Sequence, residues 1–382
     1  MSKYGCYLNM SQQQKDIVAI VKEFAERELD PLVVECDRNN TFPVSLHQKW
    51  GEMGFWGMDV PVEYGGLGFD ALTRFLITEE LAKHDAGFTI SNNSYSFGLT
   101  AILNSGTEEQ KRAACARILA GEGISLAITE PQSGSDVSGT RTTARKVDGG
   151  YILNGRKCFI TNANLCSACI VLAVTDKEAR YRGMSLFLVE KSDAGVSVGK
   201  KEDKFGIRSS DTADFLMEDV FVPDSRLIGA EGTGFAQSMG FLEKKRPVSV
   251  AGAIGIAQHA LDLAIKYAKE RKFKSGSISD LQGIQFMIAD MEMRVQAARS
   301  MAVYGAMMTD QNIPIGTLGN SLKAYGSEIC FEVVNMALQI FGGYGYSREY
   351  PVEKLLRDVR VYSIYEGTNQ IQRQVIAKTL LS

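Results

Sequence analysis

One segment of the chain combines residue types suited to cofactor binding. A short apolar run, residues 124–128, passes at Thr129 into Pro131 and the Ser-Gly-Ser-Asp sequence at 133–136. Strand-type composition followed by turn-forming residues indicates a strand that runs into a rigid loop. The loop offers hydroxyls and main-chain N–H groups at close spacing, which suit a planar, hydrogen-bonding cofactor and its phosphates. Taken alone, the same residues also fit an ordinary surface turn.

A second candidate segment, residues 157–162, has the sequence Lys-Cys-Phe-Ile-Thr-Asn. Phe159 and Thr161 share one face of a predicted strand, because side chains alternate between the two faces. The pair would place an aromatic wall and a hydroxyl donor beside a flat ring. A strand with one inward-pointing Phe explains the pattern equally well.

A glycine-rich segment, residues 339–345, lies at the end of a predicted helix and reads Gln-Ile-Phe-Gly-Gly-Tyr-Gly. Glycines at such a place form C-terminal caps and turns, but they also let a ligand approach the backbone closely. Because the segment follows a helix and not a strand, it is not a dinucleotide-binding fingerprint.

One carboxylate, Glu366, precedes Gly367 and Thr368 at the predicted entry of the last helix. A carboxylate near a helix N-terminus often serves only as a stabilising charge. In a desolvated pocket the same group would have a raised pKa and act as a general base. Sequence spacing does not choose between these two interpretations.

A charged cluster, residues 243–247 (Glu-Lys-Lys-Arg-Pro), lies near the start of a largely apolar helical pattern. An exposed basic patch is one interpretation of this cluster. In the other, Arg246 points into a site, since it comes directly before Pro247.

The rest of the sequence predicts the elements that position these residues. Apolar spacing indicates helices in the first third of the chain and again beyond residue 234. Between them, short runs of β-branched and aromatic residues separated by turns indicate strands, and these do not alternate with helices as in a Rossmann sheet. The main expected strands are 151–155, 170–174, 184–189 and 215–222, and the expected C-terminal helices are 236–271, 279–309, 315–341 and 367–381.

The predicted fold is mainly α with a β domain. An N-terminal helical domain (1–121) precedes a central antiparallel β-barrel-like domain (122–234), and a C-terminal four-helix bundle (235–382) follows. The first helix is expected to begin with Ser11 as its N-cap and to end just before Pro31.

Composition excludes several classes of protein. The length of 382 residues favours two or three packed domains, and a net charge of −3 gives no electrostatic case for binding nucleic acid or an acidic membrane. No apolar run approaches the roughly 20 residues of a membrane span. Residues 1–6 lack a secretory or transit pattern, so a cytoplasmic location is expected.

Metal and disulfide chemistry are not expected. The seven cysteines are scattered, which argues against a disulfide framework. Cys166 and Cys169 form a CxxC that leads straight into an apolar run, so they are interpreted as buried strand thiols. The three histidines lie far apart in the sequence, and no Gly-x-Ser-x-Gly nucleophile motif occurs.

Taken together, the motifs resemble the acyl-CoA dehydrogenase family over essentially the whole chain. The matching segments are 126–136, 159–161, Arg246, 339–343 and 366–370, in that order along the α–β–α plan. The resemblance implies FAD held between the β domain and the C-terminal helical domain. It also implies an acyl-CoA substrate, electron-transfer flavoprotein as the electron acceptor, and a homodimer or homotetramer.

The resemblance assigns roles to individual residues. Glu366 matches the catalytic base, and Thr129 and Thr161 are expected to hydrogen-bond the flavin ring system. Residues 339–343 are expected to reach the ADP part of FAD from a neighbouring subunit. The expected cofactor-binding residues are Leu126, Ile128, Thr129, Gly134, Ser135, Phe159, Ile160, Thr161, Arg271, Phe273, Gln282, Gln339, Gly342, Gly343, Thr368 and Gln370. The residues expected near the acyl-CoA are Ser135, Glu243, Arg246 and Gly367.

The implied reaction is the desaturation of an acyl-CoA to a trans-2-enoyl-CoA. The α-proton of a saturated thioester is a very weak acid, so its removal needs a positioned carboxylate and hydrogen bonds to the carbonyl oxygen. In family members the flavin ribityl hydroxyl and the main-chain N–H of the glutamate, here Glu366, supply those bonds. The β-hydride passes to flavin N5 as the α-proton leaves. Apolar closure would raise the glutamate pKa from about 4.3 and strengthen the base.

Two positions depart from the family pattern. The adenine-binding pattern is Arg-x-x-Phe-Gly-x-x-Ile, and Arg271 and Ile278 keep its spacing. A Lys-Ser pair at 274–275 replaces Phe-Gly, and Phe273 stands one residue early. Either Phe273 substitutes through a local shift, which is favoured, or the adenine loses its aromatic contact. Phe159 stands where many members carry Trp, which preserves an aromatic wall.

The favoured substrate is a short- or medium-chain acyl-CoA, because residues 92–94 (Asn-Asn-Ser) resemble a stretch in short-chain members. The same site can run in reverse as an enoyl-CoA reductase, and an acyl-CoA oxidase is a further alternative. A catalytically silent acyl-CoA-binding scaffold is the alternative from a different class. Glu366 argues against the scaffold, whereas the Lys-Ser pair at 274–275 leaves it open.

Overall fold

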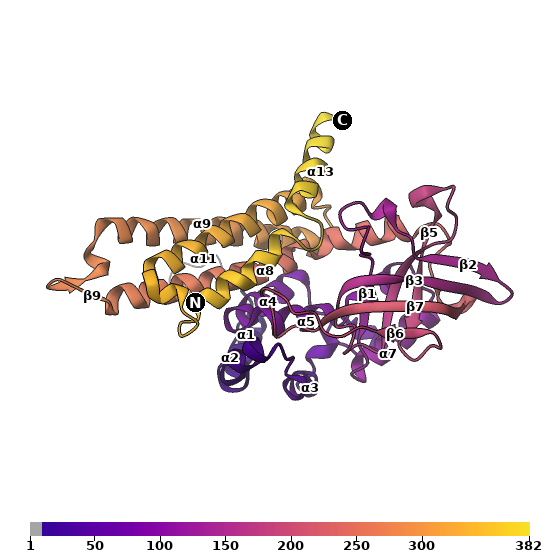
Figure 1. Ribbon diagram of the computed structural model, residues 1–382, viewed down its shortest axis with the longest axis horizontal. Helices are drawn as coiled ribbons and strands as arrows, with labels where there is room; N and C mark the ends of the chain where they lie inside the picture. Colours follow the sequence, from indigo (N-terminus) through magenta and orange to yellow (C-terminus); the bar gives the residue numbers. More distant parts are fainter. Residues whose placement is uncertain (1–9) are drawn as a thin grey trace.

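A computed structural model describes residues 10–382, so the expectation about residues 1–6 lies outside the described residues. The chain runs from helices into a sheet and back into helices. Figure 1 shows the sheet at one end, the long C-terminal helices at the other and the N-terminal helices along one side of both. The expected α–β–α fold class is therefore confirmed.

The N-terminal region contains seven α-helices within the described residues. Ser11 caps the first of them as predicted: its hydroxyl accepts a hydrogen bond from the Gln14 N–H, and the Gln14 side chain bonds the Ser11 N–H in return. The helices are α1 (Gln12–Phe24), α2 (Asp30–Asn39), α3 (Val44–Glu52), α4 (Ala71–His84), α5 (Ala86–Ser94), α6 (Phe97–Ser105) and α7 (Glu108–Leu119).

The predicted end of the first helix is wrong. The backbone continues from α1 through a π-helical turn, Ala25–Leu29, directly into α2. Pro31 occupies the first turn of α2, where a proline is tolerated. Because proline cannot donate the ladder hydrogen bond, a local widening of the helix just before it fits the sequence.

The central region forms one sheet with the order β6-β7-β3-β2-β4-β5-β8, and β1 pairs with β4. The β1–β4 and β2–β4 pairings are parallel and the other pairings are antiparallel, so the sheet is mixed where antiparallel pairing was expected. Leu153, Phe187 and Phe215 are fully buried in its core. The strands are β1 (Ile124–Ala127), β2 (Thr143–Val147), β3 (Gly150–Thr161), β4 (Ala168–Val174), β5 (Met184–Glu190), β6 (Val196–Val198), β7 (Thr212–Pro223) and β8 (Leu227–Ile228).

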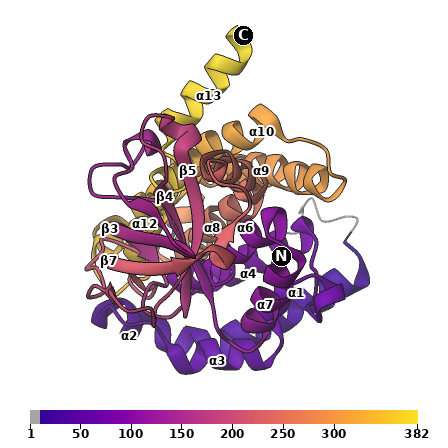
Figure 2. The ribbon, with the colours of Figure 1, turned by 90° about the vertical axis from the view of Figure 1, so that its right-hand side faces the viewer.

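The C-terminal region is built around α8, which packs against α4, α9 and α11. Small residues on α8 allow close approach to α4; a Cβ on Gly255 would lie 2.3 Å from the main-chain oxygen of Glu79. The last helix, α13, extends away from the rest of the chain (Figures 1 and 2). The helices are α8 (Gly234–Glu270), α9 (Gln282–Asp310), α10 (Gly316–Ser321), α11 (Ser327–Phe341), α12 (Val352–Val359) and α13 (Asn369–Leu381).

One stretch of α8, Glu243–Glu270, is long and apolar enough to cross a membrane by length and composition. This corrects the expectation that no apolar run approaches that length. About 72% of its most apolar window is buried inside the protein, and Ala251, Ile254 and Ala257 are fully buried in the helical core. We therefore interpret the stretch as a core helix.

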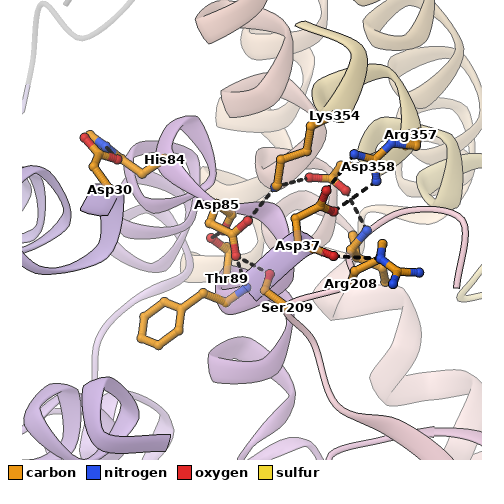
Figure 3. A network of polar contacts seen from close by, with 12 residues as sticks. Asp30, Asp37, His84, Asp85, Thr89, Arg208, Ser209, Lys354, Arg357 and Asp358 are labelled. Atoms are coloured by element: carbon orange, nitrogen blue, oxygen red, sulfur yellow. Dashed lines mark hydrogen bonds and ion pairs between the residues drawn. The ribbon is translucent and has the colours of Figure 1, made fainter. Parts of the chain in front are cut away.

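A buried ionic network joins the three regions (Figure 3). Lys354 on α12 donates to Asp358 on the same helix and to Asp85 at the start of α5, each at 2.6 Å. We call these three residues the junction triad. The Ile207 N–H, in the loop before β7, donates to Asp358 at 2.6 Å. Because α12 leads toward Glu366 and β7 pairs with β3, the network fixes the last turn relative to the sheet.

Candidate active site

The Glu366 side chain is carried by a tight turn between a 3₁₀ helix, Arg360–Ser363, and α13. Glu366 and Gly367 both have positive φ angles, 53° and 87°, so the chain reverses sharply there. Thr368 caps α13, and its hydroxyl accepts a hydrogen bond from the Ile371 N–H. The side-chain amide of Gln372 donates to the main-chain oxygens of Gly367 and Glu366, at 3.1 and 3.4 Å.

Burial raises the pKa of Glu366 above its ordinary value. A hydrogen bond from the Ser249 hydroxyl to Glu366 Oε2, 2.6 Å long, opposes that rise, as do the charges of Lys323, Arg246 and Lys245. A carboxylate with a raised pKa binds a proton more strongly than an exposed glutamate does. A raised pKa is what the general-base interpretation of Glu366 requires.

A cavity of about 30 Å³ adjoins Glu366. Residues from α4, α5, α6 and α8 close it on the side away from the last turn. Asn93 and Ser94, from the stretch that suggested a short-chain substrate, contribute to its wall. The principal lining residues are Arg74, Asn93, Phe97, Lys245, Ser249 and Tyr365.

Three charged side chains with little exposed surface form a cluster here, and we call them the pocket triad; Arg74 and Lys245 line the cavity, and Asp59 contacts both. Asp59 ends a 3₁₀ helix, Phe55–Asp59, while Arg74 lies on α4 and Lys245 on α8. Asp59 contacts Arg74 Nη1 at 2.6 Å and Lys245 Nζ at 3.3 Å. Although burial opposes it, these cations hold the pKa of Asp59 below its ordinary value. The side chain of Asp59 also accepts a hydrogen bond from the Ser96 hydroxyl at 2.6 Å.

The first two sequence motifs lie side by side in the sheet region. The Cys158 N–H donates to the main-chain oxygen of Thr129 at 2.9 Å, and the Ser125 hydroxyl donates to that of Thr161 at 2.6 Å. Lys157 is fully buried and donates to Glu130 and to the main-chain oxygen of Ile128. Burial lowers the pKa of Lys157 to about 8, against the opposing effect of Glu130. These contacts fix the start of the loop on β3.

Phe159 presents its ring at a bulge of β3. Its φ angle is 57° and its exposed fraction is 64%, which is unusual for a large aromatic side chain in a strand. Ile160 is buried in the sheet core, so only its main chain can meet a ligand, and Thr161 is half-buried. An exposed aromatic face beside a hydroxyl is a surface that fits a planar ring.

The loop beyond Thr129 is structured by its own side chains. The Ser133 hydroxyl donates to the main-chain oxygen of Asp136, and the Asp136 carboxylate accepts from the Ser138 N–H. Gly134 and Ser135 are exposed at the loop surface, and a Cβ on Gly134 would meet no atom within 4 Å. The loop therefore exposes its main chain at Gly134 and Ser135, and it begins beside the bulge of β3 that carries Phe159.

The remaining residues expected to bind the cofactor lie at the far end of the helical region. Arg271 precedes the short β9–β10 hairpin (Lys272–Phe273 and Gly276–Ser277), and Phe273 lies in β9; Figure 1 places the hairpin at the opposite end from the sheet. A groove of about 450 Å³ there is lined by Arg271, Ile278, Gly342, Gly343 and Tyr344, among others. Gln282 begins α9 and Gln339 is exposed on α11. A single chain does not bring this group to Phe159.

The hairpin explains the early position of Phe273. Lys274 and Ser275 form its turn, and Lys274 has a φ angle of 53°. Phe273, directly before the turn, is 43% exposed. Its ring is therefore available for stacking although the residue stands one position early.

Two residues expected near the substrate have different surroundings. The carboxylate of Glu243 accepts a hydrogen bond from the Gly316 N–H at 3.0 Å, so it supports the start of α10. Arg246 is half-buried, and its Nε atom is buried with no hydrogen-bond partner among the described residues. Gln370, like Gly367, is exposed near the N-terminus of α13.

Several residues of the site had no sequence signal as members of it. Ser249 and Gln372 contact Glu366 or its turn, but each is an unremarked polar residue within a helical pattern. Lys245 lies in the charged cluster that drew attention to Arg246. Within residues 10–382, no group of three or more His, Cys, Asp or Glu side chains is placed to hold a metal ion, and the cysteines are buried free thiols.

Comparison with known proteins gives matches along nearly the whole chain. Residues 11–122 match the family model described as acyl-CoA dehydrogenase, N-terminal domain. Residues 125–220 match the middle domain, and residues 232–381 match the C-terminal domain, of the same description.

Individual proteins show the same similarity. "Probable acyl-CoA dehydrogenase FadE25" of Mycobacterium tuberculosis is 38% identical over 97% of this chain and 96% of its own length. "Caffeyl-CoA reductase-Etf complex subunit CarC" of Acetobacterium woodii is 41% identical over 97% and 99%. The solved structure of butyryl-CoA dehydrogenase from Megasphaera elsdenii is 37% identical, covers 98% of this chain and 99% of its own, and superposes with a TM-score of 0.94.

Proposed function

The chain belongs to the acyl-CoA dehydrogenase family, and we propose that it desaturates a short- or medium-chain acyl-CoA to the trans-2-enoyl-CoA with Glu366 as the base. As a member of this family it is a flavin-dependent oxidoreductase, and its cofactor is FAD. The observation that carries the proposed mechanism is the environment of Glu366. Its carboxylate adjoins a cavity, accepts a hydrogen bond from Ser249 and has a raised pKa.

The residues of the sheet region fit a flavin. The exposed face of Phe159 suits stacking against the ring system, and the loop at 129–135 offers hydroxyls and main-chain N–H groups. We assign Leu126, Ile128, Thr129, Gly134, Ser135 and Thr161 to this contact, with Ile160 through its main chain. Bound FAD supplies the acceptor for the β-hydride of the substrate.

In the proposed reaction, the protein's own residues accept one proton from the substrate. Glu366 takes the α-proton on a carboxylate oxygen, and its raised pKa makes this transfer more favourable than it is for an exposed carboxylate. The Ser249 hydroxyl orients the carboxylate. The Glu366 main-chain N–H is proposed to donate to the thioester oxygen, where negative charge develops. Phe97 and Tyr365 line the cavity beside the base, and a bound acyl group would displace water from it.

The expected cofactor-binding residues at the far end of the helical region support a proposal about how subunits associate. Arg271, Phe273 and the groove with Gly342 and Gly343 lie at the far end of the same chain from Phe159 (Figure 1). We infer that they contact the ADP part of FAD bound to a neighbouring subunit, together with Gln282 and Gln339, in a homodimer or homotetramer. Thr368 and Gln370 are proposed to contact FAD from the entry of α13.

Further parts of the proposal concern partners and location. Electron-transfer flavoprotein is the proposed electron acceptor. The name of the Acetobacterium woodii relative, which mentions an Etf complex, supports this proposal. We propose a cytoplasmic location and the domain limits 1–121, 122–234 and 235–382. Gly367, Ser135, Glu243 and Arg246 are the proposed neighbours of the acyl-CoA, with Glu243 acting through its support of α10.

The reverse reaction is a second candidate function. It is favoured by the reductase relative from Acetobacterium woodii, which is as similar to this chain as the dehydrogenase relatives are. The same base would then return a proton to the α-carbon, because forward and reverse reactions share one transition state. The site residues fit both directions equally.

The proposal is tested by a visible spectrum of the purified holoenzyme and anaerobic addition of a panel of acyl-CoAs. We expect a flavin spectrum that is bleached by at least one short- or medium-chain substrate. Reoxidation of the dithionite-reduced protein by an enoyl-CoA, without bleaching by any acyl-CoA, would assign the reductase direction. A protein that cannot be reconstituted with FAD would contradict both candidate functions.

A further inference from the structure

The cavity beside Glu366 holds more cationic than anionic groups. In the pocket triad two cations share one carboxylate, Asp59. The side chains are inaccessible enough that water cannot screen them freely: the exposed fractions are 5% for Arg74, 15% for Asp59 and 17% for Lys245. Buried charges of one sign are costly unless a partner offsets them. The triad by itself therefore lacks one negative charge.

The neighbouring groups do not supply that charge. Glu366 lines the cavity, but its charge interacts with Lys323 and Arg246 as well as with Lys245. Glu243 lies near Arg246, and Glu328 is paired with Arg373. Among the described residues around the cavity, four cations therefore face three carboxylates. The cations are Arg74, Lys245, Arg246 and Lys323. The carboxylates are Asp59, Glu243 and Glu366.

Hydrogen bonding around the triad is also incomplete. Arg74 Nε is buried with no hydrogen-bond partner in the described part of the chain, although Arg74 is only 4% exposed. Its Nη2 donates to Asn93 Oδ1 at 3.3 Å, which is a long contact. The only anionic contact of Lys245 within residues 10–382 is the 3.3 Å pair with Asp59. Both side chains line the cavity, and Lys245 has donors on its ammonium group beyond the one used in this pair.

Turnover would enlarge the imbalance. When Glu366 takes the α-proton, it becomes neutral, and the cavity wall loses its carboxylate charge. A saturated alkyl chain would neither offset the cations nor accept a hydrogen bond from Arg74 or Lys245. A water molecule would accept hydrogen bonds but would leave the charge unchanged. A carboxylate on the substrate does both.

We propose that the pocket triad selects acyl groups that end in a carboxylate, so that the substrate is a short dicarboxylic acid bound to CoA through one of its two carboxyl groups. Arg74 and Lys245 bind the free carboxylate, and Asn93 donates through its side-chain amide. The cavity of about 30 Å³ has room for about two or three water-sized groups, which matches one carboxylate. Because the same cavity adjoins Glu366, we infer a short chain between that carboxylate and the α-carbon. This inference rests on the proposed function, because it names the substrate of that same site.

The test compares two five-carbon thioesters that differ in the terminal carboxylate, glutaryl-CoA and pentanoyl-CoA. The rate of anaerobic flavin reduction is measured against substrate concentration for each. We expect glutaryl-CoA to have at least a tenfold higher ratio of maximal rate to half-saturating concentration. An equal ratio, or a preference for pentanoyl-CoA, would overturn the carboxylate inference while leaving the proposed desaturation intact.

Three variants at two adjacent lysines identify the group responsible. Lys245→Met removes the excess cation and leaves the Arg74–Asp59 pair matched, so the preference for glutaryl-CoA should fall at least tenfold. Lys245→Arg should retain it. Lys244→Met, which removes an exposed charge from the same helix, is the matched control and should keep the wild-type preference. A preference that survives Lys245→Met unchanged contradicts the role of the triad.

A binding measurement separates this inference from catalysis. In a Glu366→Gln holoenzyme, calorimetric titration with each thioester reports affinity without turnover. We expect glutaryl-CoA to bind at least tenfold more tightly than pentanoyl-CoA. If no thioester bleaches the wild-type flavin, the proposed function fails, and the calorimetric ratio still decides whether the cavity recognises a carboxylate. Equal affinities would reject that recognition.

Discussion

The junction triad and the pocket triad are clusters of charged side chains with little exposed surface, and their net charges have opposite signs. In the junction triad two carboxylates share one lysine, whereas in the pocket triad two cations share one carboxylate. The first joins three regions of the chain (Figure 3). Arg74 and Lys245 of the second line the cavity beside Glu366. The difference lies in how completely each cluster is satisfied by the protein.

In the junction triad the protein itself completes the network. Main-chain N–H groups of Ile207 and Phe88 donate to its two aspartates, at 2.6 and 2.9 Å, and the Ser209 hydroxyl donates to Asp85. Although burial favours the neutral amine, the aspartates raise the pKa of Lys354. Burial also raises the pKa of Asp358, against the effect of the lysine. The junction triad therefore needs no hydrogen bond from a ligand to complete its network.

In the pocket triad the network ends at the cavity. Arg74 Nε lacks a partner within the described residues, and Lys245 makes a single long ion pair. The comparison indicates that buried charge with complete hydrogen bonding serves the fold, while buried charge with unused donors at a cavity serves a ligand. The following predictions test whether the two clusters differ in this way.

The largest effect on stability is expected at the junction triad. Lys354→Met leaves two carboxylates buried without their cation, so the free energy of unfolding should fall by about 3–5 kcal/mol. Chemical denaturation of the holoenzyme measures this change, with the exposed Lys378→Met as the control. A loss below about 1 kcal/mol would show that the junction triad is not a structural clamp.

A smaller effect on stability is expected at the pocket triad. Lys245→Met leaves a matched Arg74–Asp59 pair and removes a cation whose burial is only partly offset, so the free energy of unfolding should change by less than about 1 kcal/mol. The same denaturation series measures it. A loss as large as that of Lys354→Met would mean that Lys245 holds the fold together, and the contrast between the triads would disappear.

Much of the fold was predictable because the signals are local. The Ser11 cap, the strand composition between 122 and 230 and the apolar helical spacing each depend on neighbouring residues. The end of the first helix was predicted wrongly, since a π-helical turn lets the chain continue through Pro31. The two parallel pairings were also missed, because register between distant strands leaves no short-range pattern.

The site was predictable only in part. Glu366 and the loop after Thr129 carry motifs, so the sequence drew attention to them. Asp59 and Arg74 carry none, and Lys245 was noted only as part of the charged cluster at 243–247. The pocket triad assembles from a 3₁₀ helix and two α-helices far apart in the chain, so no local pattern indicates it. The Phe159 bulge was hidden for a related reason: strand alternation predicts a regular face and gives no sign of a positive φ angle.

The role of Glu366 is tested most directly by the pH dependence of flavin reduction in the wild-type holoenzyme and in Glu366→Gln. The base must be ionised, and burial among Lys245, Arg246, Lys323 and Ser249 raises its pKa on balance. The wild-type rate at saturating acyl-CoA should therefore fall as the pH drops through a pKa above the ordinary glutamate value. Glu366→Gln should retain FAD and lose at least about a thousandfold in rate, consistent with removal of a general base. A Glu366→Gln enzyme that keeps the wild-type rate and pH profile would contradict the account.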